Sequence, residues 1–264
     1  MERFLYTILT FLGLTVGLLQ AGASVAQEPT NLEKGKTALA QGDLSSARKF
    51  LELAYKEAPQ DTAVISALTD TYLRGQDARR AEQVLTDAVK RTPTMSELYV
   101  YLGVAQNMRG NFKTAYETLQ KANELLGAEH PLRSTLYLNL GIATQGLIAQ
   151  QTREMDGPSA LSWYDKAVEL NPRNATAHSY RGSALYRAGN YEDAVLAYSK
   201  ALEIDDSNAI ILYNRGMAYL REGNRAKACL DFHAACKRRN MNACKQITIE
   251  CTHDQLGAKQ QPEQ

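Results

Sequence analysis

The sequence lacks the short motifs that mark many catalytic sites. It contains no glycine-rich phosphate-binding loop, no HExxH zinc motif and no GxSxG nucleophile motif. Its histidines, His130, His178, His233 and His253, are scattered along the chain rather than clustered. Because no set of Asp, His and Ser residues can be assembled around them, we expect a non-catalytic protein with no metal and no cofactor.

The chain also lacks an excess of either charge and is poor in proline. Lys and Arg total 30 and Asp and Glu total 29 of 264 residues, which gives a net charge of +1. A near-neutral chain has no general attraction to nucleic acid, so we expect no nucleic-acid partner. Seven prolines and 17 glycines are too few for a collagen-like or broadly disordered chain.

The amino-terminal stretch has the pattern of a targeting segment. Residues 4–19 carry no charge, and the small residues at 21–26 resemble those before a signal-peptidase cleavage site. We therefore expect a signal peptide over residues 1–26 and export to the periplasm or the medium. The uncharged stretch is also long enough to cross a bilayer uncleaved, and Glu2 weakens the positive start of a signal peptide. A membrane anchor over residues 4–26 is the alternative.

The rest of the chain is repetitive. The stretches SALSWYDKAVELNPRN (159–174) and NYEDAVLAYSKALEIDDSN (190–208) share an Ala, a Tyr four residues later and an Ala three residues beyond it. The register divides the chain into six segments, 28–61, 62–95, 96–129, 134–174, 175–208 and 209–242. The pattern resembles the tetratricopeptide repeat (TPR), a helix–turn–helix unit of about 34 residues. This resemblance implies an all-α, right-handed superhelical solenoid of about six repeats over residues 27–242.

The residue types explain why such pairs form. Two closely packed helices need small side chains where their backbones approach, and a large side chain fills the space beside the crossing. The small residues of the first helices are Gly35, Thr69, Gly103, Gly141, Gly182 and Gly216. The large residues of the second helices are Leu51, Leu85, Leu119, Tyr164, Tyr198 and Phe232. Gly42, Gly110, Gly189 and Gly223 lie at the turns, where a left-handed residue is favoured.

One segment departs from the pattern. Seven additional residues separate Gly141 from Ala160. We expect them to lengthen both helices of the fourth unit by about one turn each.

All four cysteines lie near the end of the chain, which in an exported protein is typical of disulfides. Cys229 and Cys236 are seven residues apart, a rise of about 10.5 Å on a helix, whereas a disulfide joins Cα atoms within about 7 Å. These two cannot pair while helical, and neither can Cys244 and Cys251. If the chain reverses near Asn240, antiparallel partners keep a constant sum of residue numbers. Cys236–Cys244 and Cys229–Cys251 share that sum, so we predict these two bridges.

The bridges would attach a capping helix over 243–252 to the last repeat, with a disordered tail over 253–264. The spacing in AACKRRNMNAC also resembles the bridged helix pairs of Sel1-like repeat proteins. A zinc site including His233 and free thiols are alternatives, although the usual C-x2-C pairs of a zinc site are absent.

The TPR resemblance implies a concave groove lined by the first helices. Mapped onto this chain, the groove-facing positions include Tyr101, Val104, Asn139, Ile142, Tyr180, Tyr186, Tyr213, Asn214 and Met217. Asn139 and Asn214 occupy the position from which some relatives hydrogen-bond a peptide backbone, for which an amide supplies both donor and acceptor. The alternative is that several of these side chains pack between neighbouring helices.

We therefore predict a non-catalytic scaffold outside the cytosol that binds a peptide or protein in its groove. A membrane-tethered assembly factor for an envelope complex, held by residues 4–26, is the alternative. A membrane contact is expected only through that segment. The sequence does not specify the oligomeric state.

Overall fold

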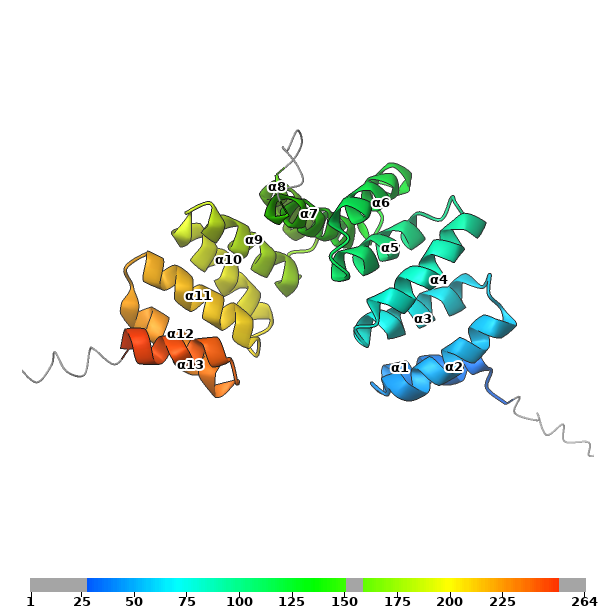
Figure 1. Ribbon diagram of the computed structural model, residues 1–264, viewed down its shortest axis with the longest axis horizontal. Helices are drawn as coiled ribbons and strands as arrows, with labels where there is room; N and C mark the ends of the chain where they lie inside the picture. Colours follow the sequence, from blue (N-terminus) through cyan, green and yellow to red (C-terminus); the bar gives the residue numbers. More distant parts are fainter. Residues whose placement is uncertain (1–27, 151–158, 252–264) are drawn as a thin grey trace, which may run out of the picture.

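The computed structural model describes residues 28–150 and 159–251, so the predicted signal peptide and tail lie outside the described residues. Within those two ranges the chain is helical and contains no strand. The helices are α1 (Asn31–Ala40), α2 (Leu44–Glu57), α3 (Thr62–Arg74), α4 (Ala78–Arg91), α5 (Ser96–Met108), α6 (Phe112–Leu125), α7 (Arg133–Ala149), α8 (Ala160–Leu170), α9 (Ala175–Arg187), α10 (Tyr191–Ile204), α11 (Ala209–Arg221), α12 (Arg225–Lys237) and α13 (Met241–Gln246), followed by a π-helical turn, η1 (Ile247–Cys251). The predicted all-α solenoid of paired helices is confirmed (Figure 1).

Short polar side chains fix where most helices begin. At α1, the Thr30 hydroxyl accepts a hydrogen bond from the Glu33 N–H at 3.2 Å, and the Glu33 carboxylate accepts one from the Thr30 N–H at 2.7 Å. Asp43, Asp61, Asp77, Ser159, Asn174, Asn208, Asn224 and Asn240 cap α2, α3, α4, α8, α9, α11, α12 and α13. Each cap satisfies backbone N–H groups that have no partner inside the helix.

The turns inside the pairs use left-handed residues, as predicted. Gly42, Gly110, Gly189 and Gly223 have φ between 75° and 83°. The turn between α3 and α4 has Gln76 in this conformation instead, with φ 58°. A non-glycine residue is less favoured there because its Cβ crowds the backbone.

The two helices of a pair meet at a small residue covered by a large one. A Cβ added to Gly216 would lie 2.7 Å from the Phe232 ring, and one added to Gly182 would lie 2.8 Å from the Tyr198 ring. At Gly141 an added Cβ would overlap the ring of Tyr164, which is fully buried. The predicted crossing of small against large residues is therefore confirmed in these pairs.

The second pair shows the effect of losing this glycine. Thr69 is 1% exposed, and its hydroxyl has no hydrogen-bond partner within the described chain. The backbones of α3 and α4 also approach each other over a shorter stretch than those of the other pairs. The α3–α4 pair therefore packs less extensively than the others and contains Thr69, a buried side chain with an unsatisfied hydroxyl.

The fourth pair differs from the expectation that both its helices are longer. Helix α7 has 17 residues against the 13 of α5, but α8 has 11. Helix α8 is not extended at its start because the Ser159 hydroxyl caps it there. The extension of α7 packs on α6, and Gly146 lies so close to the Phe112 ring that an added Cβ would overlap it.

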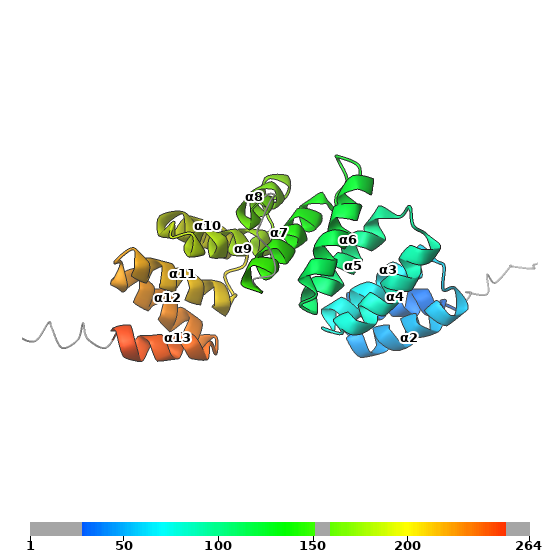
Figure 2. The same ribbon diagram turned by 45° about the horizontal axis from the view of Figure 1, so that its top comes forward.

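The pairs follow one another in chain order along an arch (Figures 1 and 2). Within the described chain, first helices of neighbouring pairs approach closely at α1 with α3, α5 with α7, and α9 with α11. The second helices show no comparable approach to one another. The first helices therefore form the inner side of the arch.

Arginines at equivalent positions of successive units join neighbouring pairs. Arg181 donates to Asp165 at 2.7 Å, and Arg215 donates to Ser199 at 3.1 Å. Arg215 also makes two hydrogen bonds of 2.8 Å to Asp231, a carboxylate that is 5% exposed. Because both Asp231 oxygens are paired, its charge is tolerated inside the last pair.

Two disulfides close the end of the solenoid with the predicted pairing. Cys229–Cys251 and Cys236–Cys244 have Cα–Cα distances of 5.7 and 4.8 Å, within the usual range. The capping element differs from the predicted helix over 243–252. It begins at Met241, because Asn240 caps it, and becomes the π-helical turn η1 from Ile247. With all four sulfurs in bridges, the structure contains neither free thiols nor a cysteine zinc site.

We expect Gly141→Ala to destabilise the fold, because the methyl group overlaps the buried Tyr164 ring. Overpacking of this kind costs about 1–3 kcal/mol, more than the helix propensity gained. Gly127→Ala is the matched control, since a Cβ there meets no atom within 4 Å. Thermal unfolding followed by circular dichroism measures both, and equal melting temperatures would contradict the crossing argument.

Candidate functional site

The inner side of the arch is built from equivalent positions of several units, because the first helices approach one another there. Three of the cavities among the described residues lie along it. We call them the amino-terminal cavity (α1, α3 and α5), the α9–α11 cavity, and the end cavity (α11, α12 and the α13–η1 segment).

The α9–α11 cavity has a volume of about 400 Å³ and a lining that mixes apolar and polar side chains. Its walls are Ala175, Thr176, Ser179, Tyr180, Ser183, Asp205, Asn208, Ile210, Ile211 and Asn214. The Tyr180 ring packs against Tyr164, with ring centroids 5.6 Å apart. This contact fixes the Tyr180 side chain on the first helix while its ring edge lines the cavity.

Two asparagines in this cavity have different roles. Asn208 is already used, because its side-chain oxygen accepts hydrogen bonds from the N–H groups of Ile210 and Ile211. The half-buried Asn214 amide makes no hydrogen bond to another described residue. It therefore offers one acceptor and two donors to a ligand.

The amino-terminal cavity measures about 480 Å³ and is lined by Lys36, Leu39, Ala63, Ser66, Ala67, Asp70, Leu73 and Tyr101. Burial, followed by the nearby Asp70 and Glu97 carboxylates, raises the pKa of Tyr101. The Tyr101 hydroxyl therefore stays protonated at neutral pH and can donate a hydrogen bond. The cavity combines an apolar wall with one ammonium and one carboxylate group.

The end cavity measures about 610 Å³ and lies where the last pair meets the cap. Met217, Leu220 and Arg221 come from α11, Gly223 from the turn that follows it, Arg225 from the start of α12, and Gln246 and Glu250 from the cap, the α13–η1 segment.

The structure places the predicted groove residues in different surroundings. It brings Tyr180 and Asn214 together in the α9–α11 cavity, Tyr101 in the amino-terminal cavity and Met217 in the end cavity. Half-buried Val104 lines none of the three.

Three other predicted groove residues make contacts within the solenoid. Ile142 packs against the core cluster around Tyr164, and Tyr213 packs on the Phe232 ring at 5.9 Å. Tyr186 packs edge-on against Tyr191 at 5.3 Å.

Asn139 differs from the expectation of a peptide-binding amide. It is 6% exposed, and its side-chain nitrogen donates to the Thr135 carbonyl at 2.8 Å. Its carbonyl and side-chain oxygens accept from the Asn107 amide at 2.8 and 3.3 Å. Asn139 therefore joins α5 to α7 instead of facing the groove.

Sequence reasoning missed several cavity residues. Lys36 and Asp70 occupy the same position in the first and second units as Met217 does in the sixth. The repeat register that identified Met217 would therefore also have identified them. Asp205 and Asn208 lie in the connection between two units. The sequence analysis considered only helix positions as groove-facing, so it did not include them.

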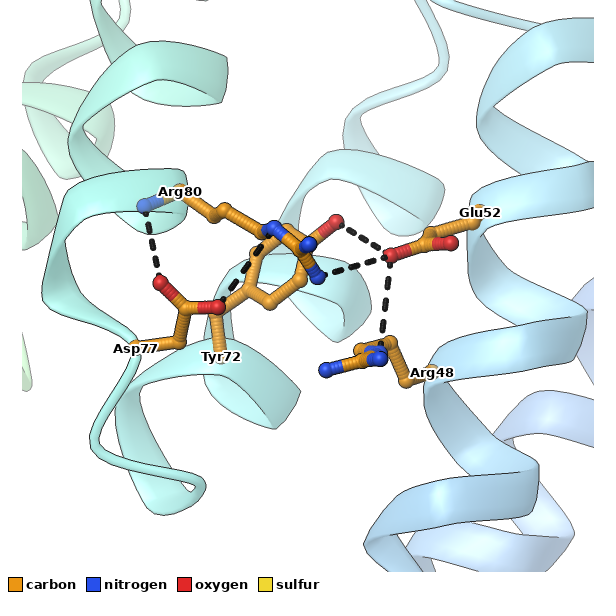
Figure 3. Close-up of polar contacts among 5 residues, drawn as sticks. All are labelled: Arg48, Glu52, Tyr72, Asp77 and Arg80. Atoms are coloured by element: carbon orange, nitrogen blue, oxygen red, sulfur yellow. Dashed lines mark hydrogen bonds and ion pairs between the residues drawn. The ribbon is translucent and has the colours of Figure 1, made fainter.

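A separate polar cluster joins α2, α3 and α4, and Figure 3 shows its five residues. The Glu52 carboxylate accepts a hydrogen bond from the Tyr72 hydroxyl at 2.9 Å and lies 3.6 Å from both Arg48 and Arg80. Asp77 pairs with Arg80 at 3.5 Å. Each charged side chain has an oppositely charged partner, so we interpret the cluster as a structural contact between the first and second helix pairs. Burial, and then the hydrogen bond to Glu52, raises the pKa of Tyr72.

Neither a cluster of potential metal ligands nor a membrane-spanning helix occurs in residues 28–150 and 159–251. No three His, Cys, Asp or Glu side chains gather as they would around a metal ion. No helix there has the length and apolar character needed to span a membrane.

Comparisons with known proteins agree with the repeat pattern. The family model described as "TPR repeat" matches residues 158–189 and 182–223, and "Tetratricopeptide repeat" matches 38–99. No curated protein matches the sequence significantly.

Solved structures share the fold at low identity. The chain resembles the APC/C hetero-tetramer Cut9–Hcn1 at 20% identity and TM-score 0.72, covering 83% of this chain and 42% of that chain. It thus spans less than half of that relative's length. It resembles PilF of Pseudomonas aeruginosa at 17% identity and TM-score 0.66, over 83% of this chain and 96% of that one. It also resembles YrrB, whose structure is described as a TPR protein with an unusual peptide-binding site. The identity is 21% and the TM-score 0.52, and the match covers 75% of this chain and 97% of that chain.

We expect Tyr72→Phe to lower the free energy of unfolding at neutral pH by about 1 kcal/mol, because the hydrogen bond to Glu52 is lost. An unfolded tyrosine ionises near pH 10, whereas the folded state keeps Tyr72 neutral to higher pH. The contribution of Tyr72 is therefore complete below about pH 10 and is lost as the pH rises above it.

Denaturant unfolding at a series of pH values checks this expectation. The wild type should lose stability above pH 10 more steeply than the variant does. Tyr55→Phe, a change at a half-buried tyrosine of α2, is the control. Parallel pH curves for wild type and Tyr72→Phe would refute the assignment.

Proposed function

The chain is a tetratricopeptide-repeat protein, and from this premise we propose that it is a non-catalytic scaffold that holds a peptide or protein partner on its inner side, outside the cytosol. The observation that carries the proposal is the α9–α11 cavity. There an unpaired Asn214 amide lies beside the anchored Tyr180 ring and a row of small hydroxyl side chains.

This lining suits an extended polypeptide. A main chain presents alternating N–H and C=O groups, and the Asn214 amide satisfies one of each. Ser179 lies on the same helix as Tyr180 and adds a hydroxyl that can both donate and accept. The neighbouring Ser183 hydroxyl is already used, because it donates to the Ser179 carbonyl at 3.1 Å and pairs with the Tyr198 hydroxyl at 3.0 Å. The peptide-binding site named for YrrB shows that a protein of this fold can serve such a purpose.

The cysteines and the amino terminus support the proposed cellular setting. Two structural disulfides are typical of oxidising compartments outside the cytosol. The proposal combines them with the signal peptide predicted over residues 1–26. If residues 4–26 are retained instead, the protein is a membrane-tethered assembly factor with the same inner surface.

Peptides selected from a random phage-displayed library on the oxidised protein test the groove. We expect Asn214→Ala and Tyr180→Ala each to weaken a selected peptide about tenfold, the effect of losing one well-formed hydrogen bond or aromatic contact. Leu196→Ala is the control, because Leu196 is 58% exposed on the second helix α10. Fluorescence anisotropy gives the dissociation constants. Failure to enrich any peptide, or equal binding by all variants, would count against the proposal.

Expression of the full chain in a bacterial host tests the export part. We expect to find the protein in the periplasmic fraction. Its intact mass should be that of a chain that starts at Gln27, because cleavage follows Ala26. A mass that includes residues 1–26, recovered with the membranes, would replace the exported scaffold by the tethered one. Recovery in the cytosol with reduced cysteines would contradict both forms.

A further inference from the structure

The cap is one wall of the end cavity. Helix α11 contributes Met217, Leu220 and Arg221, while η1 contributes Glu250 from the opposite side. The cavity therefore keeps its shape only while the far end of the cap stays against α12.

The end cavity has an apolar wall and a net positive lining. Met217 and Leu220 are half-buried, and Arg225 pairs with Glu250 at 3.2 Å. The exposed Arg221 has no carboxylate within ion-pair distance among the described residues. Its Nε donates to the Tyr186 hydroxyl at 3.4 Å. Among the described residues, the Arg221 guanidinium therefore has no carboxylate partner, and it lies beside apolar side chains.

This lining selects the chemistry of an occupant. A guanidinium forms its strongest hydrogen bonds with carboxylates, and its planar shape allows two in parallel. The adjacent Met217 and Leu220 side chains favour an apolar neighbour of that carboxylate. An acidic side chain next to an apolar one in a peptide provides both groups.

The two ends of the cap are held differently. Its start is tied by a short turn, by Cys236–Cys244, and by a hydrogen bond from the Asn240 side chain to the Ala209 carbonyl at 3.2 Å. Its far end is held by Cys229–Cys251, with the Arg225–Glu250 pair beside it. In that ion pair Arg225 is exposed and Glu250 is half-buried, so solvent weakens the attraction between them. The position of Glu250 therefore depends on the Cys229–Cys251 bridge together with the packing of Ile247 on the core cluster of the last pair.

We propose that the end cavity binds an acidic, partly apolar peptide segment, and that the Cys229–Cys251 bridge is required for this binding. The inference rests on the proposed function, since the end cavity is the last part of the inner surface. It adds the chemical class of the partner segment and makes the site dependent on the redox state.

A short fluorescent peptide of alternating leucine and glutamate, blocked at both ends, is the probe, and its leucine–glutamine counterpart is the reference. We expect the oxidised protein to bind the glutamate peptide at least tenfold more tightly. Arg221→Gln should weaken binding of the glutamate peptide about tenfold, as expected for the loss of one charge-assisted hydrogen-bond pair. Arg187→Gln is the matched control, because Arg187 holds the equivalent position of the preceding unit and lies outside the end cavity.

Two pairs of serine variants test the bridge. Cys229→Ser with Cys251→Ser should abolish binding of the glutamate peptide, whereas Cys236→Ser with Cys244→Ser should retain most of it. Circular dichroism and gel filtration establish that each variant keeps the solenoid. If the first pair of changes unfolds the protein, the claim that the bridge acts on the cavity itself is overturned, because the bridge then acts through overall stability. The charge of the lining is tested separately by Glu250→Gln. With both bridges intact this change frees Arg225, and the glutamate peptide should bind about threefold more tightly.

The inference is overturned if both peptides bind equally, if Arg221→Gln and Arg187→Gln behave alike, or if the two pairs of serine variants cannot be distinguished. Binding to anionic phosphatidylglycerol vesicles without binding to the glutamate peptide would also overturn it. Library-selected peptides that still depend on Asn214 would then show that the groove proposal stands and that the end-cavity inference alone has failed.

Discussion

The close crossing of two helices at one small residue is the contact on which the rest of the solenoid depends. Where Gly141 faces the buried Tyr164 ring, the helix backbones approach within a distance that no other residue permits. A pair formed in this way has one apolar side left over, which the next pair covers. The inner surface is therefore a consequence of packing, and its side chains are the part of each first helix that packing does not use.

Departures from the crossing pattern show how much freedom this leaves. Thr69 gives a looser second pair with an unsatisfied buried hydroxyl, yet the stack continues through it. The longer α7 gains a contact between Gly146 and Phe112, and Asn139 joins it to Asn107 of α5. Residues assigned by repeat position to the groove are diverted there to hold two first helices together. The α9–α11 cavity lies where no such lengthened helix intervenes.

The extent to which the sequence predicts the structure follows from the range of each interaction. The crossing glycines, the left-handed turns and the nested bridges depend on residues close in sequence or on a fixed period, and all were predictable. The burial of Asn139 depends on Asn107, thirty-two residues away on a neighbouring unit, and no positional rule contains it. The π-helical turn and the cavity wall at Glu250 likewise arise from how the last segment meets α12.

The end of a solenoid is the point where this packing has no further pair to continue it. The apolar side of the last pair needs a cover, but α13 has 6 residues, fewer than the roughly 12–15 at which an isolated helix is even marginal in water. Cross-links supply what the helix cannot, because they hold the cover in place even where it frays. The same bridges that seal the core therefore also define the surface at this end. The proposed dependence of the end cavity on the Cys229–Cys251 bridge follows from this double role.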